Sequence, residues 1–168
     1  QYFYSYLNET GRAGFVMASS GSDAGHSEKL IRKEIIDTGA VDVMVSIGNK
    51  FFYSVTLPCA LWFFDRAKEK DEVRKDQVLM LDLRNVYRKV SSKLHDFTQG
   101  HLDNIHAIVG LYRGDNRLFN ELVEHYTATN NATELEWLTS RFPDGEYVDV
   151  LGLCKVANRA EIADNDYS

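Results

Sequence analysis

Hydrophobic residues in the first half of the chain gather in short runs that have the length of β-strands. The runs cover residues 15–19, 41–47, 58–65 and 78–83. Their apolar, β-branched and aromatic side chains are typical of strands buried in a sheet. Between the first two runs, Leu30, Ile31 and Ile35 recur at helical spacing, with Ser27 as a candidate N-cap and Gly39 as the terminating residue. The pattern predicts strand, helix, strand, and then two further strands.

The lengths of the connections predict how these strands pair. The first two runs are joined through a helix, and a crossover of that kind implies a parallel pair. The second and third runs are joined by a loop of about ten residues, which implies an antiparallel return. Pro58 has no N–H to donate and must lie at the start of its strand. The run 78–83 is expected at the sheet edge or on a neighbouring subdomain.

The second half of the chain has a helical pattern. Leu102, Ile105, Val109 and Tyr112 fall on one helical face, and residues 116–125 and 132–140 predict two more helices. Residues 147–158 are expected to be extended or irregular. This change of pattern divides the chain into an α/β part, residues 1–95, and a helical and irregular extension, residues 96–168. The charge run 67–75 is interpreted as a solvated loop.

Three consecutive aromatic residues occupy the loop between the second and third runs. Phe51, Phe52 and Tyr53 follow Gly48 and Asn49. Aromatic rings are costly to leave in water unless they cover or stack on another group. A flat ring at the end of a buried strand suits a planar ligand such as a nucleobase. The alternative is that a ring packs into the core, and this is the expected role of Phe51.

The net charge of −6 and the isoelectric point near 5.3 argue against a free-standing DNA-binding protein, which would gain its affinity from Lys and Arg on phosphates. The average hides one basic patch. Arg84, Arg88, Lys89 and Lys93 lie within ten residues, with no acid among them. This patch is a candidate contact with the DNA backbone or with a partner subunit. The alternative is a solvated basic face.

Other classes of function find little support in the sequence. No apolar run approaches the length of a membrane span, and no signal peptide is visible. Cys59 and Cys154 stand at unrelated positions, which fits a reducing cytosol and predicts a cytoplasmic location. No cysteine or histidine cluster has metal-ligand spacing, and no histidine pairs with a nucleophile. No metal site and no catalytic residue are therefore assigned.

Several short blocks along the chain carry a resemblance to a known family. They are Gly11-Arg-Ala-Gly-Phe-Val, Ile31-Arg-Lys, Val41-Asp-Val, Phe52-Tyr53, Pro58, Leu61-Trp-Phe, Asp82-x-Arg84, Arg88-Lys89 and Tyr147-x-Asp-Val-x-Gly-Leu-Cys-Lys. No single block is specific, but their order resembles the late part of the catalytic domain of DNA adenine-N6 methyltransferases. Among these enzymes, the sequence is most similar to the methylation subunit of type I restriction-modification systems. The resemblance covers nearly the whole chain.

The resemblance implies a fold and a function. The fold would be part of a class I, Rossmann-like methyltransferase sheet with a terminal antiparallel strand. The parent protein would transfer a methyl group from S-adenosylmethionine to N6 of adenine in DNA, beside specificity and restriction subunits. In such enzymes, one aromatic ring of this loop packs on the target adenine after it leaves the duplex, and Phe52 matches that position. Tyr53 lies beside it as a second candidate contact with the target adenine, and its hydroxyl could hydrogen-bond a phosphate or the neighbouring backbone. Ser20 or Ser22 would be near DNA phosphates.

Two family motifs are missing from this chain. It has no Gly-x-Gly-x-x-Gly loop, and its only prolines, Pro58 and Pro143, form no Pro-Pro pair. In the family, the cofactor loop and the catalytic Asn/Asp-Pro-Pro-Phe/Tyr motif lie upstream of the Gly11 block. We therefore expect the C-terminal half of a methyltransferase domain, inactive alone and with no cofactor-binding residue.

Such a half domain would expose the edge of strand 15–19. We expect this edge to cause self-association or to be covered, for instance by residues 1–7. The alternative hypothesis from a different class is a non-catalytic α/β interaction module.

Overall fold

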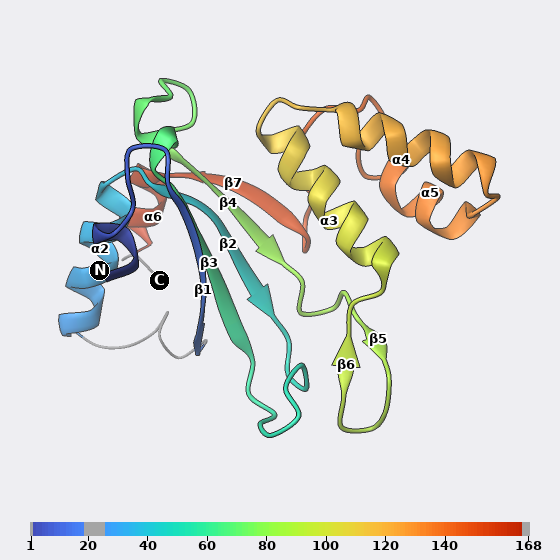
Figure 1. The fold of residues 1–168 in the computed structure, drawn as a ribbon, viewed down its shortest axis with the longest axis horizontal. Coiled ribbons are helices and arrows are strands. Elements are labelled where there is room, and N and C mark those ends of the chain that lie inside the picture. Colours follow the sequence, from blue (N-terminus) through green and yellow to red (C-terminus); the bar gives the residue numbers. More distant parts are fainter. Residues whose placement is uncertain (1, 19–25, 166–168) are drawn as a thin grey trace.

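The centre of the molecule is a five-stranded mixed sheet (Figure 1), in a computed structural model that describes residues 2–18 and 26–165. The strands are β1 (Arg12–Ala18), β2 (Val41–Ile47), β3 (Cys59–Asp65), β4 (Gln77–Asp82) and β7 (Cys154–Asn158). Their order is β1-β3-β2-β4-β7. Only the pair β2–β4 is parallel, and the other neighbours are antiparallel. The predicted α/β class is confirmed, with an antiparallel strand, β7, at one end of the sheet.

Two predictions about strand neighbours are wrong. Strands β1 and β2 run in the same direction, but they do not pair because β3 lies between them. Strand β4 is not at an edge, since it lies between β2 and β7. The burial of β3 explains its central place: Trp62 and Phe64 are buried on one face and Cys59 on the other. A strand with apolar groups on both faces is best placed inside a sheet.

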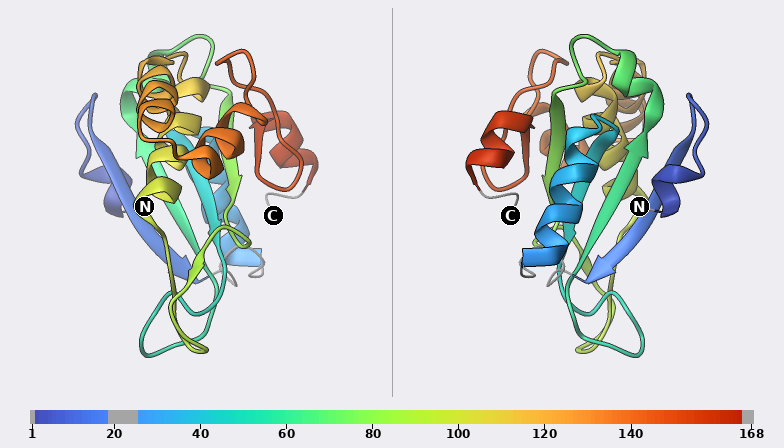
Figure 2. Two further views of the ribbon diagram at one scale, coloured as in Figure 1. Left: turned by 90° about the vertical axis from the view of Figure 1, so that its right-hand side faces the viewer. Right: turned by 90° about the vertical axis from the view of Figure 1, so that its left-hand side faces the viewer.

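Helices cover both faces of the sheet (Figure 2). One face carries α2 (His26–Asp37), α6 (Arg159–Asp164) and the short α1 (Tyr2–Ser5). The other face carries α3 (Gln99–Tyr112), α4 (Arg117–Ala128) and α5 (Ala132–Thr139), which confirm the three helices predicted in the second half. Helix α2 already begins at His26, so Ser27 lies within it and is not its N-cap.

Local sequence fixes the start of the longest helix. The Thr98 side chain accepts a hydrogen bond from the backbone N–H of His101, and the His101 ring accepts one from the backbone N–H of Thr98. This reciprocal pair satisfies two donors that a helix start leaves unpaired. Residues 96–168 also return to the sheet, through β7 and α6. The division into residues 1–95 and 96–168 stays a prediction.

The charge run 67–75 is not simply a solvated loop. It contains a short 3-10 helix, η2 (Arg66–Lys70), and Lys68 within it is fully buried. The Lys68 ammonium donates hydrogen bonds to the carbonyl oxygens of Gly39 at 2.9 Å and Val41 at 2.8 Å. The prediction is therefore wrong for Lys68. The long aliphatic stem crosses the core, and the charged end reaches carbonyls at the start of β2.

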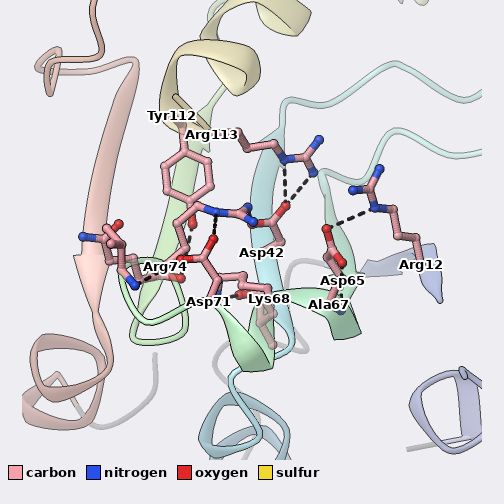
Figure 3. Close-up of polar contacts among 12 residues, drawn as sticks. Arg12, Asp42, Asp65, Ala67, Lys68, Asp71, Arg74, Tyr112 and Arg113 are labelled. Atoms are coloured by element: carbon pink, nitrogen blue, oxygen red, sulfur yellow. Dashed lines mark hydrogen bonds and ion pairs between the residues drawn. The ribbon is translucent and has the colours of Figure 1, made fainter. Parts of the chain in front are cut away.

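A second buried charge lies beside Lys68, on β2. The Asp42 side chain is fully buried, and the Arg113 guanidinium donates two hydrogen bonds to it, at 3.1 and 2.5 Å (Figure 3). Arg74 approaches the other carboxylate oxygen at 3.6 Å. Arg113 directly follows α3, so this ion pair fastens the helix to the sheet. Removing one partner would leave an unpaired buried charge, which is strongly destabilising.

Candidate functional site

Two loops lie together at one edge of the sheet. Strands β2 and β4 are parallel, so their carboxyl ends meet at this edge. Residues 48–58 leave the end of β2, and residues 83–94 leave the end of β4; both loops extend beyond the sheet (Figure 1). Ligands of open α/β sheets bind outside the carboxyl ends of the strands. The predicted phosphate contacts at Ser20 and Ser22 fall outside the described residues.

The three aromatic residues of the first loop have different surroundings. Phe51 packs against the core, with its ring 4.8 Å from Phe97 and edge-on to His95 at 6.2 Å. Its predicted core role is confirmed. Phe52 is 37% exposed and Tyr53 is 95% exposed. Their predicted contact with a target adenine stays a prediction, but both rings are accessible from solvent.

The second loop holds the predicted basic patch. Part of this loop folds into a hairpin, β5 (Arg88–Lys89) and β6 (His95–Asp96). Arg84 forms two hydrogen bonds with Asp82, at 2.8 and 2.6 Å. Arg88 forms two with Asp96, at 2.9 and 2.5 Å. The flanking acids thus compensate two cations of the patch.

The ion pairs also act on the acids. The Arg84 hydrogen bond lowers the pKa of Asp82, and the Arg88 hydrogen bond lowers the pKa of Asp96. Both carboxylates therefore stay ionised near neutral pH. Lys89 is exposed and has no ion pair within the residues that the structure describes. Contact of Arg84, Arg88 or Lys89 with DNA or a partner stays a prediction.

Three residues of this region were missed in the sequence. Lys50 bonds to the hairpin, and Tyr87 stacks on His95 with ring centroids 4.0 Å apart and planes 7° apart. The residue pair Ser91-Ser92 is the signal that could have predicted the turn between the two strands of the hairpin. The ring pair itself leaves no local signal, because its members are eight residues apart.

A groove of about 560 Å³ opens between β2, β4 and the turn before β7. Met44 and Met80 line its apolar floor, and Asp82 and Asp149 are among its polar residues. Asp82 is engaged by Arg84, while Asp149 accepts hydrogen bonds from the Tyr147 hydroxyl at 3.0 Å and the Val156 N–H at 2.8 Å. Both carboxylates are thus hydrogen-bonded within the chain, and we assign them a structural role in the wall of the groove.

Neither a metal site nor a thiol site emerges from the geometry. Within the described ranges, no three His, Cys, Asp or Glu side chains gather in a way that could hold a metal ion. Cys59 and Cys154 are both free and buried, and burial raises the pKa of each thiol. Raised thiol pKa values keep both groups protonated and unreactive.

None of the helices in residues 2–18 and 26–165 is long and apolar enough to cross a membrane.

Solved structures share this architecture. The type I restriction-modification methyltransferase subunit from Streptococcus thermophilus superposes with a TM-score of 0.61 over 98% of this chain and 26% of that chain, at 17% identity. The M protein of the type I restriction enzyme EcoKI gives a TM-score of 0.52 over 64% of this chain and 23% of that chain, at 20% identity. This chain therefore shares the fold of about a quarter of each of these two proteins.

The sequence assigns the family. The family described as N-6 DNA Methylase matches residues 1–168, so the chain belongs to the N-6 DNA methylases. It is 32% identical to the type I restriction enzyme MjaIX methylase subunit of Methanocaldococcus jannaschii, over 99% of this chain and 25% of that protein. It is 28% identical to the HindI methylase subunit of Haemophilus influenzae, over 99% of this chain and 30% of that protein. The chain spans about a quarter to a third of the length of these relatives.

Proposed function

We propose that this chain is part of the methylation subunit of a type I restriction-modification system, which transfers a methyl group from S-adenosylmethionine to N6 of adenine in DNA. The observation that carries the proposal is the family match over all 168 residues. The order of the sequence blocks and the similarity to type I methylase subunits support it. The subunit would work in the cytoplasm, where its DNA is.

In this proposal the chain supplies one wall of the target-base site. Phe52, which is 37% exposed, would stack on the extruded adenine. A base taken out of the duplex loses its stacking, and an aromatic ring replaces part of that energy. Tyr53 is more exposed and lies next in the chain, where it would contact the same nucleotide. The basic hairpin, with Lys89 exposed, would lie against a phosphate backbone.

Among the described residues at the carboxyl edge, the groups that S-adenosylmethionine would need are already in contact with other parts of this chain. At the carboxyl edge the only glycine of the two loops is Gly48, and a Cβ built there would lie 2.8 Å from the Arg84 carbonyl oxygen. Protein backbone already fills that space, so a cofactor cannot approach it. Asp82 and Asp96 are each paired with an arginine, so they are engaged before any ribose hydroxyl arrives. In this proposal, the rest of the parent subunit therefore binds the cofactor and supplies the groups that act on the adenine amine.

Two experiments test this proposal. The first assembles the full-length subunit with its specificity subunit and incubates it with DNA and labelled cofactor; nucleoside analysis should find N6-methyladenine. Methylcytosine, or no methylated base, would contradict the proposal. The second titrates this chain alone with S-adenosylmethionine in a calorimeter. We expect no tight binding, and a dissociation constant in the low micromolar range would contradict the assignment of the cofactor site elsewhere.

The alternative function is a non-catalytic interaction module. It predicts that the full-length protein binds its partner subunits but yields no N6-methyladenine. The methylation assay therefore separates the two proposals.

A further inference from the structure

The aromatic loop is held in shape by the neighbouring hairpin, and Lys50 is the junction. The backbone of Lys50 has a φ of 69°, a left-handed conformation that a lysine rarely adopts. Its carbonyl oxygen accepts a hydrogen bond from the His95 N–H at 2.8 Å. Its side-chain ammonium donates a hydrogen bond to the Ser92 carbonyl at 2.9 Å. Backbone strain of this kind persists only where the surroundings fix it, and here both bonds come from one hairpin.

Stacked rings make a second connection between loop and hairpin. The Tyr87 ring lies parallel to the His95 ring, with centroids 4.0 Å apart. The Phe51 ring meets the same His95 ring edge-on, with centroids 6.2 Å apart. His95 is buried, while Tyr87 is 41% exposed. Phe51 directly precedes Phe52. The hairpin rings therefore fix the backbone from which Phe52 projects.

The two loops also touch through their backbones. A side chain at Gly48 would meet the Arg84 carbonyl oxygen at 2.8 Å, so the start of the aromatic loop lies directly on the start of the basic loop. Three kinds of contact, namely backbone packing, hydrogen bonds and ring stacking, thus join residues 48–53 to residues 84–97. The same hairpin carries Arg88 and Lys89.

We propose that Lys50, Tyr87 and His95 are positioning residues, which hold Phe52 where it captures the target adenine and couple that ring to the basic hairpin. This inference rests on the proposed function, and it assigns to the hairpin a role that the family match does not give it. A phosphate held by the hairpin and a base held by Phe52 would then lie at a fixed separation. Docking of the DNA backbone would set the base-capturing ring in place at the same time.

A double-mutant cycle in the full-length subunit, assembled with its specificity subunit, tests this coupling. The variants are Tyr87→Ala, Phe52→Ala and the double variant, with methylation rate as one readout. The other is the fluorescence of 2-aminopurine at the target position, which reports a base leaving the stack. We expect Tyr87→Ala to lower the rate about tenfold, because small misplacements of a reacting group are costly. In the Phe52→Ala background, the same change should have almost no further effect, because the ring that Tyr87 positions is gone.

Controls separate positioning from loss of stability. Tyr87→Phe keeps the stack and should retain the rate, while Lys50→Met loses the bond to Ser92 and should behave like Tyr87→Ala. His125→Ala removes an exposed ring that contacts Tyr126 in the helical layer, and it should change neither readout. Thermal unfolding of each variant checks that it is folded.

The two proposals fail in different ways. If Phe52→Ala lowers the rate and Tyr87→Ala lowers it by the same factor with or without Phe52, the positioning role is wrong and the proposed function stands. If Phe52→Ala leaves rate and fluorescence unchanged, the base-stacking role of Phe52 is wrong, and the positioning role fails with it.

Discussion

Phe51 and Phe52 are neighbours with opposite surroundings, and this makes each a control for the other. In the full-length methylation subunit that we propose, Phe52→Ala should lower methylation efficiency about ten- to hundredfold, since stacking is worth roughly 1–3 kcal/mol per base. Phe51→Ala should instead lower the free energy of unfolding by about 3 kcal/mol, the low end for a lost phenylalanine, because its ring is only partly buried. Steady-state kinetics and denaturant titration measure the two effects.

One result would reverse this assignment. If Phe51→Ala abolished methylation at unchanged stability while Phe52→Ala were silent, the base-stacking ring would be Phe51. Phe52→Trp keeps an aromatic face and should retain more activity than Phe52→Ala. Cofactor affinity should stay the same in all three variants, because neither ring belongs to the proposed cofactor site.

Lys68 makes stability depend on pH in a predictable direction. Burial lowers the pKa of its ammonium to about 8, against an ordinary value near 10.4. Between about pH 8 and pH 10 the unfolded chain therefore holds a proton that the folded chain has released, so this group adds stability as pH rises. The free energy of unfolding of the wild type, minus that of Lys68→Met, should therefore increase as pH rises across that window. Denaturant titrations at several pH values measure it.

Other buried groups change the stability in the opposite direction as pH rises, and subtracting the free energy of unfolding of Lys68→Met from that of the wild type cancels them. Burial raises the pKa of Tyr126 to about 12 and also raises that of both cysteines. Because these groups ionise first in the unfolded chain, they lower the stability of the folded protein as pH rises. They do so equally in the wild type and the variant. Lys70→Met, two residues away on an exposed side chain, should show no such trend. A flat difference curve for Lys68→Met from pH 7 to pH 10 would contradict the prediction.

The sequence carries different amounts of information about these residues. The two strands around the aromatic loop are readable from composition, but Phe52 was singled out only by the resemblance to adenine methyltransferases, because the loop pattern alone does not separate it from Phe51. The burial of Lys68 is not readable, because a lysine in a run of charges looks solvated. Only the fold brings its ammonium to the carbonyls of Gly39 and Val41. Asp42 is a clearer case, because a carboxylate inside the apolar run of β2 implies a buried partner for its charge.

At the scale of elements, Gly48 sets the distance between the aromatic loop and the basic loop. Gly48→Ala places a Cβ against the Arg84 carbonyl oxygen, a backbone atom that cannot rotate away. One of the two loops must then shift, and overpacking of this kind costs about 1–3 kcal/mol. We expect a lower melting temperature and weaker protection in hydrogen exchange of the His95 amide, whose N–H donates to the Lys50 carbonyl oxygen. The exposed neighbour Ser54→Ala is the control. Unchanged protection in Gly48→Ala would show that the loops are not packed as described.

The order of strands was harder to predict than their positions. The apolar runs gave β1 to β4 within a few residues, because strand composition is local information. Pairing is not local. A connection through a helix predicts two strands of the same direction, and β1 and β2 do run in the same direction. The rule says nothing of a later strand inserting between them, as β3 does. The segment that holds β7 was predicted only as extended or irregular, since its residues alternate weakly and its partner β4 lies far back in the chain.

At the scale of the whole molecule, charge is distributed unevenly. Residues 99–149, with helices α3 to α5, hold nine acids and three arginines but no lysine. The basic hairpin lies apart from this layer, at the carboxyl edge of the sheet. The negative net charge therefore does not conflict with a DNA-facing edge, because the acids are concentrated on another part of the surface.

The two edges of the sheet differ, and the difference predicts how the isolated chain associates. At the β7 edge, the Asp149 carboxylate accepts the Val156 N–H at 2.8 Å, so a side chain occupies part of this short strand. Within the described residues, the seven-residue β1 pairs only with β3. Helix α1 covers one face of β1, where Phe3 stacks on Phe15 at 5.1 Å, but Val16 and Phe63 remain exposed on the other face. The predicted cover by residues 1–7 thus reaches a face of β1 and not its hydrogen-bonding edge.

An open strand with apolar side chains is a template for pairing with another strand. In the proposed parent subunit, an upstream strand would fill this place. For the chain alone we expect reversible self-association that increases with concentration in sedimentation velocity. Val16→Lys puts a charge on the exposed face of β1 and should shift the equilibrium to the monomer. Val148→Lys changes an exposed valine near the opposite edge and should associate like the wild type. A wild-type chain that stays monomeric at high concentration would contradict an open β1 edge, and equal loss of association in both variants would place the contact elsewhere.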